Sequence, residues 1–223
     1  MATSLSELAY SKIKGEIANF KLIPGDRFSE NSLVKQLAMS RTPIREALFK
    51  LQQEGWVEVQ FRSGWLVKPF DFNRFEHLYD LRLVLETAAV RRLADAETVA
   101  LDALTAIWLV ALKDRETDGK RVAKLDEAFH TGLISALGNP EIARVHQDVT
   151  EQIRIIRRLD FTQTSRIEAT YDEHGQILRA IAMHRADQAI LLLRTHIETS
   201  KTEVRKMTLS ELSQARSRKR QTK

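Results

Sequence analysis

The chain has 223 residues, of which 43% are hydrophobic, a formal net charge of +5 and no cysteine. The absence of cysteine excludes a disulfide framework and a thiolate metal site. No apolar run approaches the ~20 residues of a membrane-spanning helix, and the N-terminus lacks the pattern of a secretion signal. We therefore expect a cytoplasmic protein of one or two domains, with no membrane partner.

The charge is placed unevenly along the chain. Residues 1–70 carry ten basic and seven acidic side chains, residues 71–208 carry twenty and twenty-two, and residues 209–223 carry five and one. A basic N-terminal part on a slightly acidic body fits a DNA-binding protein, because phosphate neutralisation supplies much of the affinity for DNA. The basic tail is expected to be a disordered, solvated end rather than a specific DNA arm.

Two short helices are predicted before residue 40. Apolar residues recur at helical spacing from Leu5 to Phe20, and a Pro-Gly turn follows them. A second helix is predicted from about Ser29 to Leu37. Only a tight turn separates it from the next predicted helix, so these two should form a helix-turn-helix.

The third predicted helix has the features of a DNA-reading helix. Thr42 suits the N-cap, Pro43 suits the first helical position, and Gly55 can end the helix in a left-handed conformation. One face is apolar, while Arg41 and Arg45 lie toward the other side. Arginine there can reach guanine edges while the helix end binds phosphate. The segment by itself is equally compatible with an ordinary surface helix.

A two-stranded hairpin is predicted directly after this helix. The β-forming segments 57–60 and 65–68 flank a turn at residues 61–64. Three helices and a hairpin make a winged helix-turn-helix. Arg62 at the wing tip would then lie near the minor groove or the DNA backbone, and Gly64 would allow a close approach.

Residues 8–68 resemble the GntR family of bacterial transcription regulators. The resemblance rests on the segments PGDRFSE, SRTPIREAL, EGWV and SGWLV, in that order. It implies operator contacts from the third helix, phosphate contacts beside it and a wing turn that lies on the duplex. The residues concerned are, respectively, Arg41, Thr42 and Arg45; Arg27 and Ser40; and Arg62 and Gly64.

Two residues depart from the family pattern. Phe20 stands where glycine is usual before the Pro-Gly turn. Asn31 stands where the fatty-acid-responsive members carry a DNA-contacting arginine. The operator of this protein therefore need not match theirs.

After residue 70 the sequence predicts an antiparallel bundle of about six helices, so the fold class is mainly α. Proline ends the second wing strand, and only helical periodicity follows. Long helices with short connections favour antiparallel packing. The helices are expected near 73–94, 98–115, 120–137, 142–156, 165–184 and 187–209. The predicted domains are 1–70 for DNA binding, 71–209 for effector binding and dimerisation, and a tail at 210–223.

One carboxylate and three imidazoles could meet inside this bundle. Asp126 and His130 are four residues apart on one predicted helix and so share a face. His174 and His196 lie on the fifth and sixth bundle helices. If the helices converge, the set suits Zn²⁺, Ni²⁺, Fe²⁺ or Mn²⁺. Spacing alone favours the simpler interpretation that these are surface or capping residues.

Residues 73–208 resemble the FCD ligand-binding domain of the FadR branch of the GntR family, in its shorter, VanR-like group. Three segments match in order: Asp126 with His130 four residues on, His174 in a Tyr-x-x-His context, and His196 on the last helix. The resemblance implies that these four residues bind a divalent metal ion. Members that sense acyl-CoA lack these ligands, so an acyl-CoA effector is not expected.

A metal ion with four protein ligands can retain open positions for a small organic acid. Arg82 could anchor its carboxylate, and the family often carries arginine at this place. The alternative for Arg82 is a surface pair with Glu86, four residues on. Further positive charge could come from Arg154, Arg157 or Arg158.

We therefore expect a homodimeric, metabolite-responsive transcription regulator, with repression as the favoured mode, and not an enzyme. A dimer is expected because one short helix reads few base pairs, and two-fold symmetry doubles the contacts on pseudo-palindromic double-stranded DNA. Two alternatives remain at this point. One is a DNA-binding regulator with a purely structural metal, and the other is a metal-dependent hydrolase.

Overall fold

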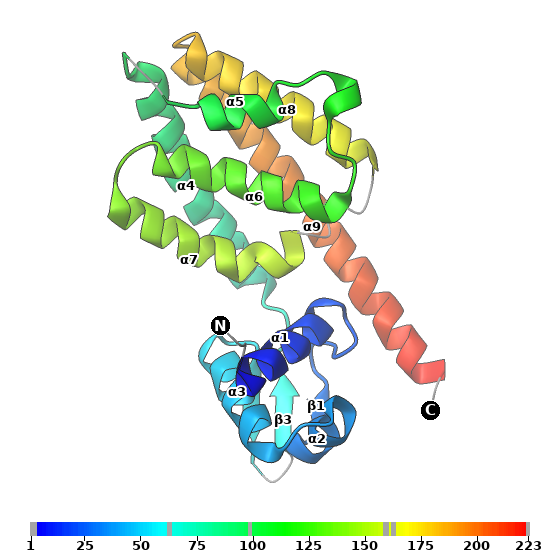
Figure 1. The fold of residues 1–223 in the computed structure, drawn as a ribbon. Coiled ribbons are helices and arrows are strands. Elements are labelled where there is room, and N and C mark those ends of the chain that lie inside the picture. The colour runs from blue at the N-terminus through cyan, green and yellow to red at the C-terminus, as the bar shows by residue number, and fades with distance from the viewer. Residues whose placement is uncertain (1–3, 62–63, 98–99, 158–160, 162–163, 222–223) are drawn as a thin grey trace. The chain divides into compact units, whose positions relative to one another are not determined.

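The computed structural model describes the chain except for residues 1–3, 62–63, 98–99, 158–160, 162–163 and 222–223. The chain forms two compact units, one of Met1–Asp71 with Leu209–Lys223 and the other of Phe72–Thr208. Figure 1 shows their elements. No helix within the described ranges is long and apolar enough to cross a membrane.

The first unit contains a winged helix-turn-helix, as predicted. Its helices are α1 (Leu5–Ala18), α2 (Glu30–Leu37) and α3 (Arg41–Gln53), and its strands are β1 (Arg27–Phe28), β2 (Val57–Gln60) and β3 (Gly64–Val67). The strands form an antiparallel sheet in the order β1-β3-β2. The two-residue strand β1 was not predicted, because a strand so short shows no alternating pattern in the sequence.

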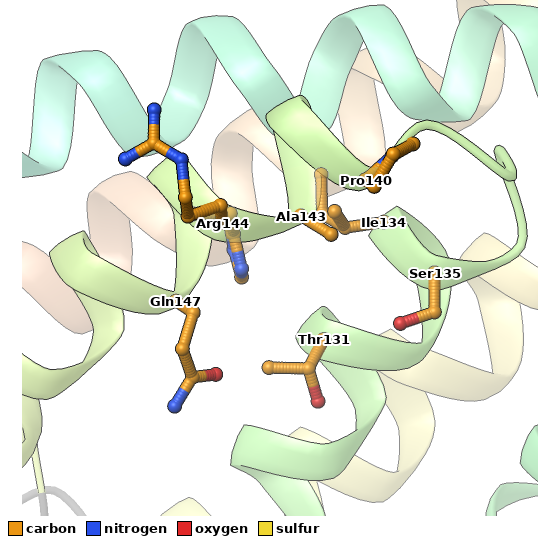
Figure 2. A pocket seen from close by; sticks show the side chains of 8 residues that line it. Thr131, Ile134, Ser135, Pro140, Ala143, Arg144 and Gln147 are labelled. Carbon is orange, nitrogen blue, oxygen red and sulfur yellow. The ribbon is translucent and has the colours of Figure 1, made fainter.

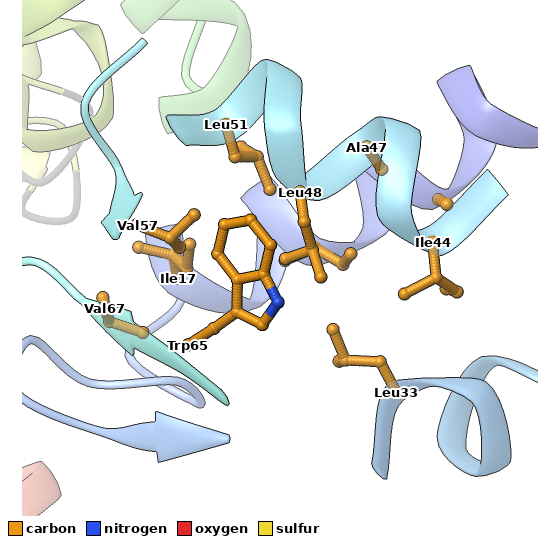
Figure 3. Packing of buried hydrophobic residues seen from close by; sticks show 11 residues of the cluster. Ile17, Leu33, Ile44, Ala47, Leu48, Leu51, Val57, Trp65 and Val67 are labelled. Atoms are coloured by element: carbon orange, nitrogen blue, oxygen red, sulfur yellow. The ribbon is translucent and has the colours of Figure 1, made fainter. Parts of the chain in front are cut away.

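The core of this unit lies between the three helices and the wing. Ile44, Leu48 and Leu51 of α3 are fully buried, as their helical spacing predicts. Figure 3 shows them beside Trp65 of β3, which is buried in the same cluster. This packing leaves the opposite face of α3 exposed.

Helix α3 begins two residues earlier than predicted, at Arg41 instead of Pro43. Its N-cap is Ser40, in an extended conformation and with no side-chain capping bond, so Thr42 is not the cap. Pro43 is instead the third helical residue. Proline is tolerated there because the first N–H groups of a helix have no intrahelical acceptor. Gly55 has φ +82°, in agreement with its predicted role after the helix.

Gly64 allows β3 to lie against the chain at β1. Its φ is +88°, and a Cβ atom at this position would lie 2.6 Å from the carbonyl oxygen of Phe28. A side chain would therefore add both backbone strain and a clash with the backbone. The positive φ and the close approach of the two strands therefore account for glycine at position 64.

Replacing Gly64 with alanine is expected to lower the free energy of unfolding by about 2 kcal/mol or more, because the strain and the clash act together. Equilibrium urea denaturation of the full chain measures the change. The matched control is Gly15→Ala in α1, where nothing lies within 4 Å of an added Cβ atom. That change should stabilise the protein by ~0.5–1 kcal/mol. Equal effects of both substitutions would contradict this account.

The second unit is a bundle of long helices, and about six were predicted. Its α-helices are α4 (Phe72–Asp95), α5 (Asp102–Trp108), α6 (Gly119–Ser135), α7 (Pro140–Arg157), α8 (Thr164–Ala182) and the first part of α9 (Ala186–Gln221). A 3₁₀ turn, η1, spans Leu112–Asp114. In Figure 1, α6 and α7 run beside α4.

The helix predicted for residues 98–115 is much shorter in the structure. Helix α5 ends at Trp108, and residues 98–99 lie outside the described part of the chain. Trp108 is buried, but Leu109 is 41% and Leu112 75% exposed. The apolar periodicity continues through these leucines, but no core packs around them to hold a longer helix.

Helix α9 is longer than predicted, because a disordered tail was expected from residue 210. The helix continues to Gln221. Within the first unit, Leu212 and Ala215 are buried in a small apolar cluster with Ile23, and Phe20 packs against it. This segment therefore has an apolar face to bury, which the count of its charges did not reveal.

Candidate metal centre and DNA-binding surface

Five of the seven residues predicted to contact DNA are exposed on the first unit. Ser40, Arg41 and Thr42 are exposed at the start of α3, and Arg45 follows them on the same helix. Arg27 is exposed on β1. The helix start thus presents unsatisfied N–H groups together with two guanidinium groups, which is a suitable surface for phosphate and base edges.

Two of the predicted DNA-contacting residues, Arg62 and Gly64, belong to the wing. Gly64 is partly buried at the start of β3, and Arg62 lies outside the described residues. The close approach of Gly64 to Phe28 accounts for glycine at this position without any DNA contact. A role for Gly64 in DNA contact therefore remains a prediction.

Arg45 is held in place by Glu30 of α2. Its Nη2 atom donates a hydrogen bond to Glu30 Oε2 at 2.9 Å, and the Arg45 side chain stays 56% exposed. The hydrogen bond from Arg45 lowers the pKa of Glu30 against the opposing effect of burial. The ion pair therefore orients an exposed guanidinium on the outer face of α3. The N–H groups of this guanidinium that do not bind Glu30 can donate hydrogen bonds to DNA.

Four side chains of types that can ligate a metal converge from three helices in the second unit. Asp126 and His130 come from α6, His174 from α8 and His196 from α9. All four are buried, and one ligand atom from each lies within 4.8 Å of the others. The structure thus brings together the four residues on which the metal prediction rests.

The spacing of these atoms fits a divalent metal ion. The Nε2 atom of His196 lies 3.2 Å from that of His174 and 3.3 Å from that of His130. Asp126 Oδ1 lies between 3.4 and 3.9 Å from the three Nε2 atoms. Ligands at ~2.0–2.2 Å from a shared ion stand roughly 3–4 Å from one another. The residues present therefore suit such an ion.

Two of the imidazoles are oriented by carboxylates. Glu86 of α4 accepts a hydrogen bond from His130 Nδ1 at 2.6 Å, and Glu173 of α8 accepts one from His196 Nδ1 at 2.6 Å. A neutral ring that donates from Nδ1 in this way has its lone pair on Nε2, the atom that lies in the cluster. Carboxylate–histidine pairs of this kind fix the ring and raise its basicity as a ligand.

His174 is held by aromatic contacts instead. Its ring stacks on Phe129 with centroids 3.6 Å apart and an interplanar angle of 9°, and it meets the Trp108 ring edge-to-face at 4.2 Å. Trp108 is itself buried against this candidate ligand. The aromatic surroundings exclude water from that side of the cluster.

The electrostatic surroundings favour the metal-binding protonation states of His174, His196 and Asp126. Burial, followed by the neighbouring His196, lowers the pKa of His174 well below its usual value. Burial likewise lowers the pKa of His196 to about 4. Burial alone would raise the pKa of Asp126, but Arg157 and the histidines outweigh it and hold the value well below normal. Neutral imidazole and ionised carboxylate are the forms that bind metals.

Glu86 is also the centre of a buried polar network. Its Oε1 atom accepts hydrogen bonds from Arg82 Nε at 2.7 Å and from His146 Nε2 at 2.9 Å. The Arg82–Glu86 pair considered in the sequence does form, but it is buried rather than on the surface, with side chains 1% and 0% exposed. His146 joins the same network as a partner of Glu86, outside the ligand set.

Two of the three arginines considered as sources of positive charge lie in the described part of the chain, on α7. Arg157 is buried, and its Nη2 atom donates to Asp126 Oδ2. Arg154 is about half exposed and pairs with Glu127. Arg158 lies outside the described residues. Arg157 was expected only as one of three possible sources of positive charge, and Glu86 and Glu173 were not expected to orient the histidines, because helical spacing does not reveal which neighbour a side chain meets.

A cleft with a volume of about 370 Å³ lies between the end of α6 and the start of α7. Figure 2 shows its lining. The residues are Thr131, Ile134, Ser135, Pro140, Ala143, Arg144, His146 and Gln147. His146 therefore connects this cleft with Glu86, while the four clustered ligand residues do not line it.

Comparison with known proteins matches two family models. The model of bacterial regulatory proteins of the gntR family matches residues 5–67, and the FCD domain model matches residues 77–199. The chain is 31% identical over 179 residues to the Nta operon transcriptional regulator of Aminobacter aminovorans, covering 78% of this chain and 82% of that protein. It is 27% identical to the HTH-type transcriptional regulator LutR of Bacillus subtilis, covering 81% and 92%.

A solved structure has the same fold. It is that of Lar, described as controlling the expression of the Listeria monocytogenes agr system, with a TM-score of 0.69 and 20% sequence identity. The match covers 92% of this chain and 99% of that one. The named sequence relatives are transcriptional regulators and not enzymes.

Proposed function

The chain belongs to the GntR family of bacterial regulatory proteins and carries an FCD domain, and we propose that a small organic acid, bound at a metal ion in that domain, controls its affinity for operator DNA. The protein is a DNA-binding transcription regulator. The metal, the acid and their effect on DNA binding are the proposal.

The observation that carries the proposal is the buried cluster of Asp126, His130, His174 and His196. Two of its imidazoles are oriented by carboxylates, as they are in metal sites. The four residues would hold the ion, and the ion would supply a Lewis-acidic point for a carboxylate. Arg82, whose guanidinium reaches this network through Glu86, is the proposed anchor on the protein side.

For DNA binding we propose a homodimer on a pseudo-palindromic operator, in the cytoplasm. Arg41, Thr42 and Arg45 at the start of α3 would reach the bases, because these side chains are exposed there. Arg27 and Ser40 would add phosphate contacts, and the wing turn would lie on the duplex. Repression is the simplest mode, because a dimer bound over a promoter blocks other proteins from the same DNA.

Regulation would follow from a shift between two arrangements of the bundle. The candidate ligand residues lie on α6, α8 and α9, and Glu86 of α4 is hydrogen-bonded to one of them. An acid bound at the cluster would therefore be connected to four helices of the bundle. The acid moves the equilibrium only by its difference in affinity for the two arrangements. A change in the spacing of the two reading heads would then alter operator affinity.

The test is a thermal-shift screen of mono-, di- and tricarboxylates, with and without a chelator. An acid at ~100 times its Kd should add ~2.7 kcal/mol to the stability of the native state. A rise in melting temperature that disappears on chelation supports the proposal. A large fall on chelation alone, with no rise for any acid, would mean that the metal is only structural and that the effector proposal is wrong.

A further inference from the structure

Two buried arginines beside the metal cluster share an unusual arrangement. Arg82 uses Nε to bind Glu86, and Arg157 uses Nη2 to bind Asp126. Within the described part of the chain, the Nη1 and Nη2 atoms of Arg82 and the Nη1 atom of Arg157 are buried and have no hydrogen-bond acceptor. Buried donors of a charged group are costly to leave unpaired, so these atoms indicate a place for an acceptor.

The unpaired donors lie on facing helices. On α7, His146, Thr150 and Arg157 recur at the spacing of one helix face. His146 on that face contacts Glu86 of α4, which also binds Arg82. Arg157 joins the same network through Asp126, whose Oδ2 atom accepts its hydrogen bond. Asp126 Oδ1 lies 3.5 Å from His130 Nε2, and His130 Nδ1 binds Glu86. The Thr150 hydroxyl is likewise buried with no hydrogen-bond partner among the described residues.

The charges of this interior point to the class of ligand. Among the described residues of the second unit, the buried cations are Arg82, Arg157 and Arg166. Glu86, Asp126 and the partly buried Glu173 balance them, if the histidines are counted as neutral. A divalent ion at the cluster would leave two positive charges uncompensated. Buried charge is tolerated only when it is paired, so a ligand with two negative charges would complete the site.

We propose that the unpaired donors of Arg82 and Arg157, with the Thr150 hydroxyl, bind a second acidic group of the effector, which is therefore a small dicarboxylate. One carboxylate would lie at the metal ion and the other between α4 and α7. This inference rests on the proposed function, because it requires the metal and an acid effector. It adds the number of acidic groups and assigns a binding role to Arg157 and Thr150.

The experiment compares acids that differ only in the second carboxylate. Calorimetric titration of the metal-loaded full chain uses the dicarboxylates from malonate to adipate, each against the monocarboxylate with the same number of carbons. At least one dicarboxylate should bind roughly 10- to 100-fold more tightly than its partner, because it gains charge-assisted hydrogen bonds. Metal content is measured after each titration, so that loss of the ion to the acid is detected.

The variant Arg157→Gln tests the residue. Glutamine keeps a donor for Asp126 but removes the charge, so the preference for the dicarboxylate should disappear in protein that is kept loaded by saturating metal. The matched control is Arg154→Gln on the same helix, whose side chain is 47% exposed and pairs with Glu127. This control should keep both the metal and the preference.

Three results would overturn the inference, and they are distinguishable. Monocarboxylates that bind as tightly as their partners would refute the dicarboxylate class and leave the proposed function standing. A preference that persists in Arg157→Gln would refute the role of Arg157. If no acid of either kind binds to the metal-loaded protein, the proposed function fails as well.

Discussion

Replacing His174 with alanine is expected to remove the metal ion from the purified protein. His174 Nε2 lies 3.2 Å from His196 Nε2 and 3.4 Å from Asp126 Oδ1, at the centre of the donor set. The expected loss in metal affinity is roughly 100-fold or more. Even mutation of a residue that only hydrogen-bonds to a metal ligand lowers metal affinity by about 10–100-fold. Elemental analysis of the metal per chain, with chelator competition, gives the measurement.

The matched control is His77→Ala, an exposed histidine of the same unit. It should keep the wild-type metal content. His174→Ala also creates a cavity between Phe129 and Trp108, so its stability will fall for a second reason. The chelator separates the two effects: it should lower the melting temperature of the wild type but not that of His174→Ala. Unchanged metal content in His174→Ala would place the ion elsewhere.

Glu86 connects the candidate metal centre with α4 and α7. It contacts His130, Arg82 and His146, and is itself 0% exposed. Although burial raises its pKa, Arg82 and then His130 outweigh that effect and hold the pKa well below its usual value. A ligand that binds Arg82 would therefore change the electrostatic environment of Glu86, which orients the candidate metal ligand His130. This is a physical route by which an acid could alter the arrangement of α4 and α6.

The sequence was sufficient where structure depends on local periodicity or on motif. The apolar face of α3 and the helical positions of His130 and His174 follow from spacing of 3.6 residues. The convergence of three helices on one point was implied by the resemblance to the FCD domain, and spacing alone argued against it. Burial of all four residues is a result of packing.

Packing also explains what the sequence did not predict. Glu173 directly precedes His174, yet it binds His196 on another helix, 23 residues away. Arg154 and Arg157 look equivalent in the sequence, but only Arg157 is buried against Asp126. The early end of α5 and the helical segment after residue 209 likewise depend on which apolar side chains find a partner.

Replacing Arg45 with alanine is expected to abolish specific operator binding while the fold remains intact. A bidentate arginine–guanine contact discriminates by about 1–3 kcal/mol, and a two-fold dimer would lose two such contacts, which corresponds to a fall of roughly 10²-fold or more in specific affinity. The wild-type protein first selects its operator from a random DNA pool. Gel-shift titrations of that operator and of unrelated DNA then give the specificity ratio.

The Arg45–Glu30 pair makes a control necessary, because alanine also removes an ion pair. Arg194→Ala breaks a surface pair with Glu198 at an equally exposed position in the second unit, with side chains 50% and 57% exposed. It should leave the specificity ratio unchanged. Glu30→Gln should weaken binding less than Arg45→Ala does, because it releases the guanidinium without removing it. If Arg45→Ala retains sequence-specific binding, the assignment of Arg45 as a base-reading residue of α3 is wrong. If it loses specificity but keeps salt-sensitive binding to any DNA, Arg45 reads bases and the remaining cations hold the phosphates.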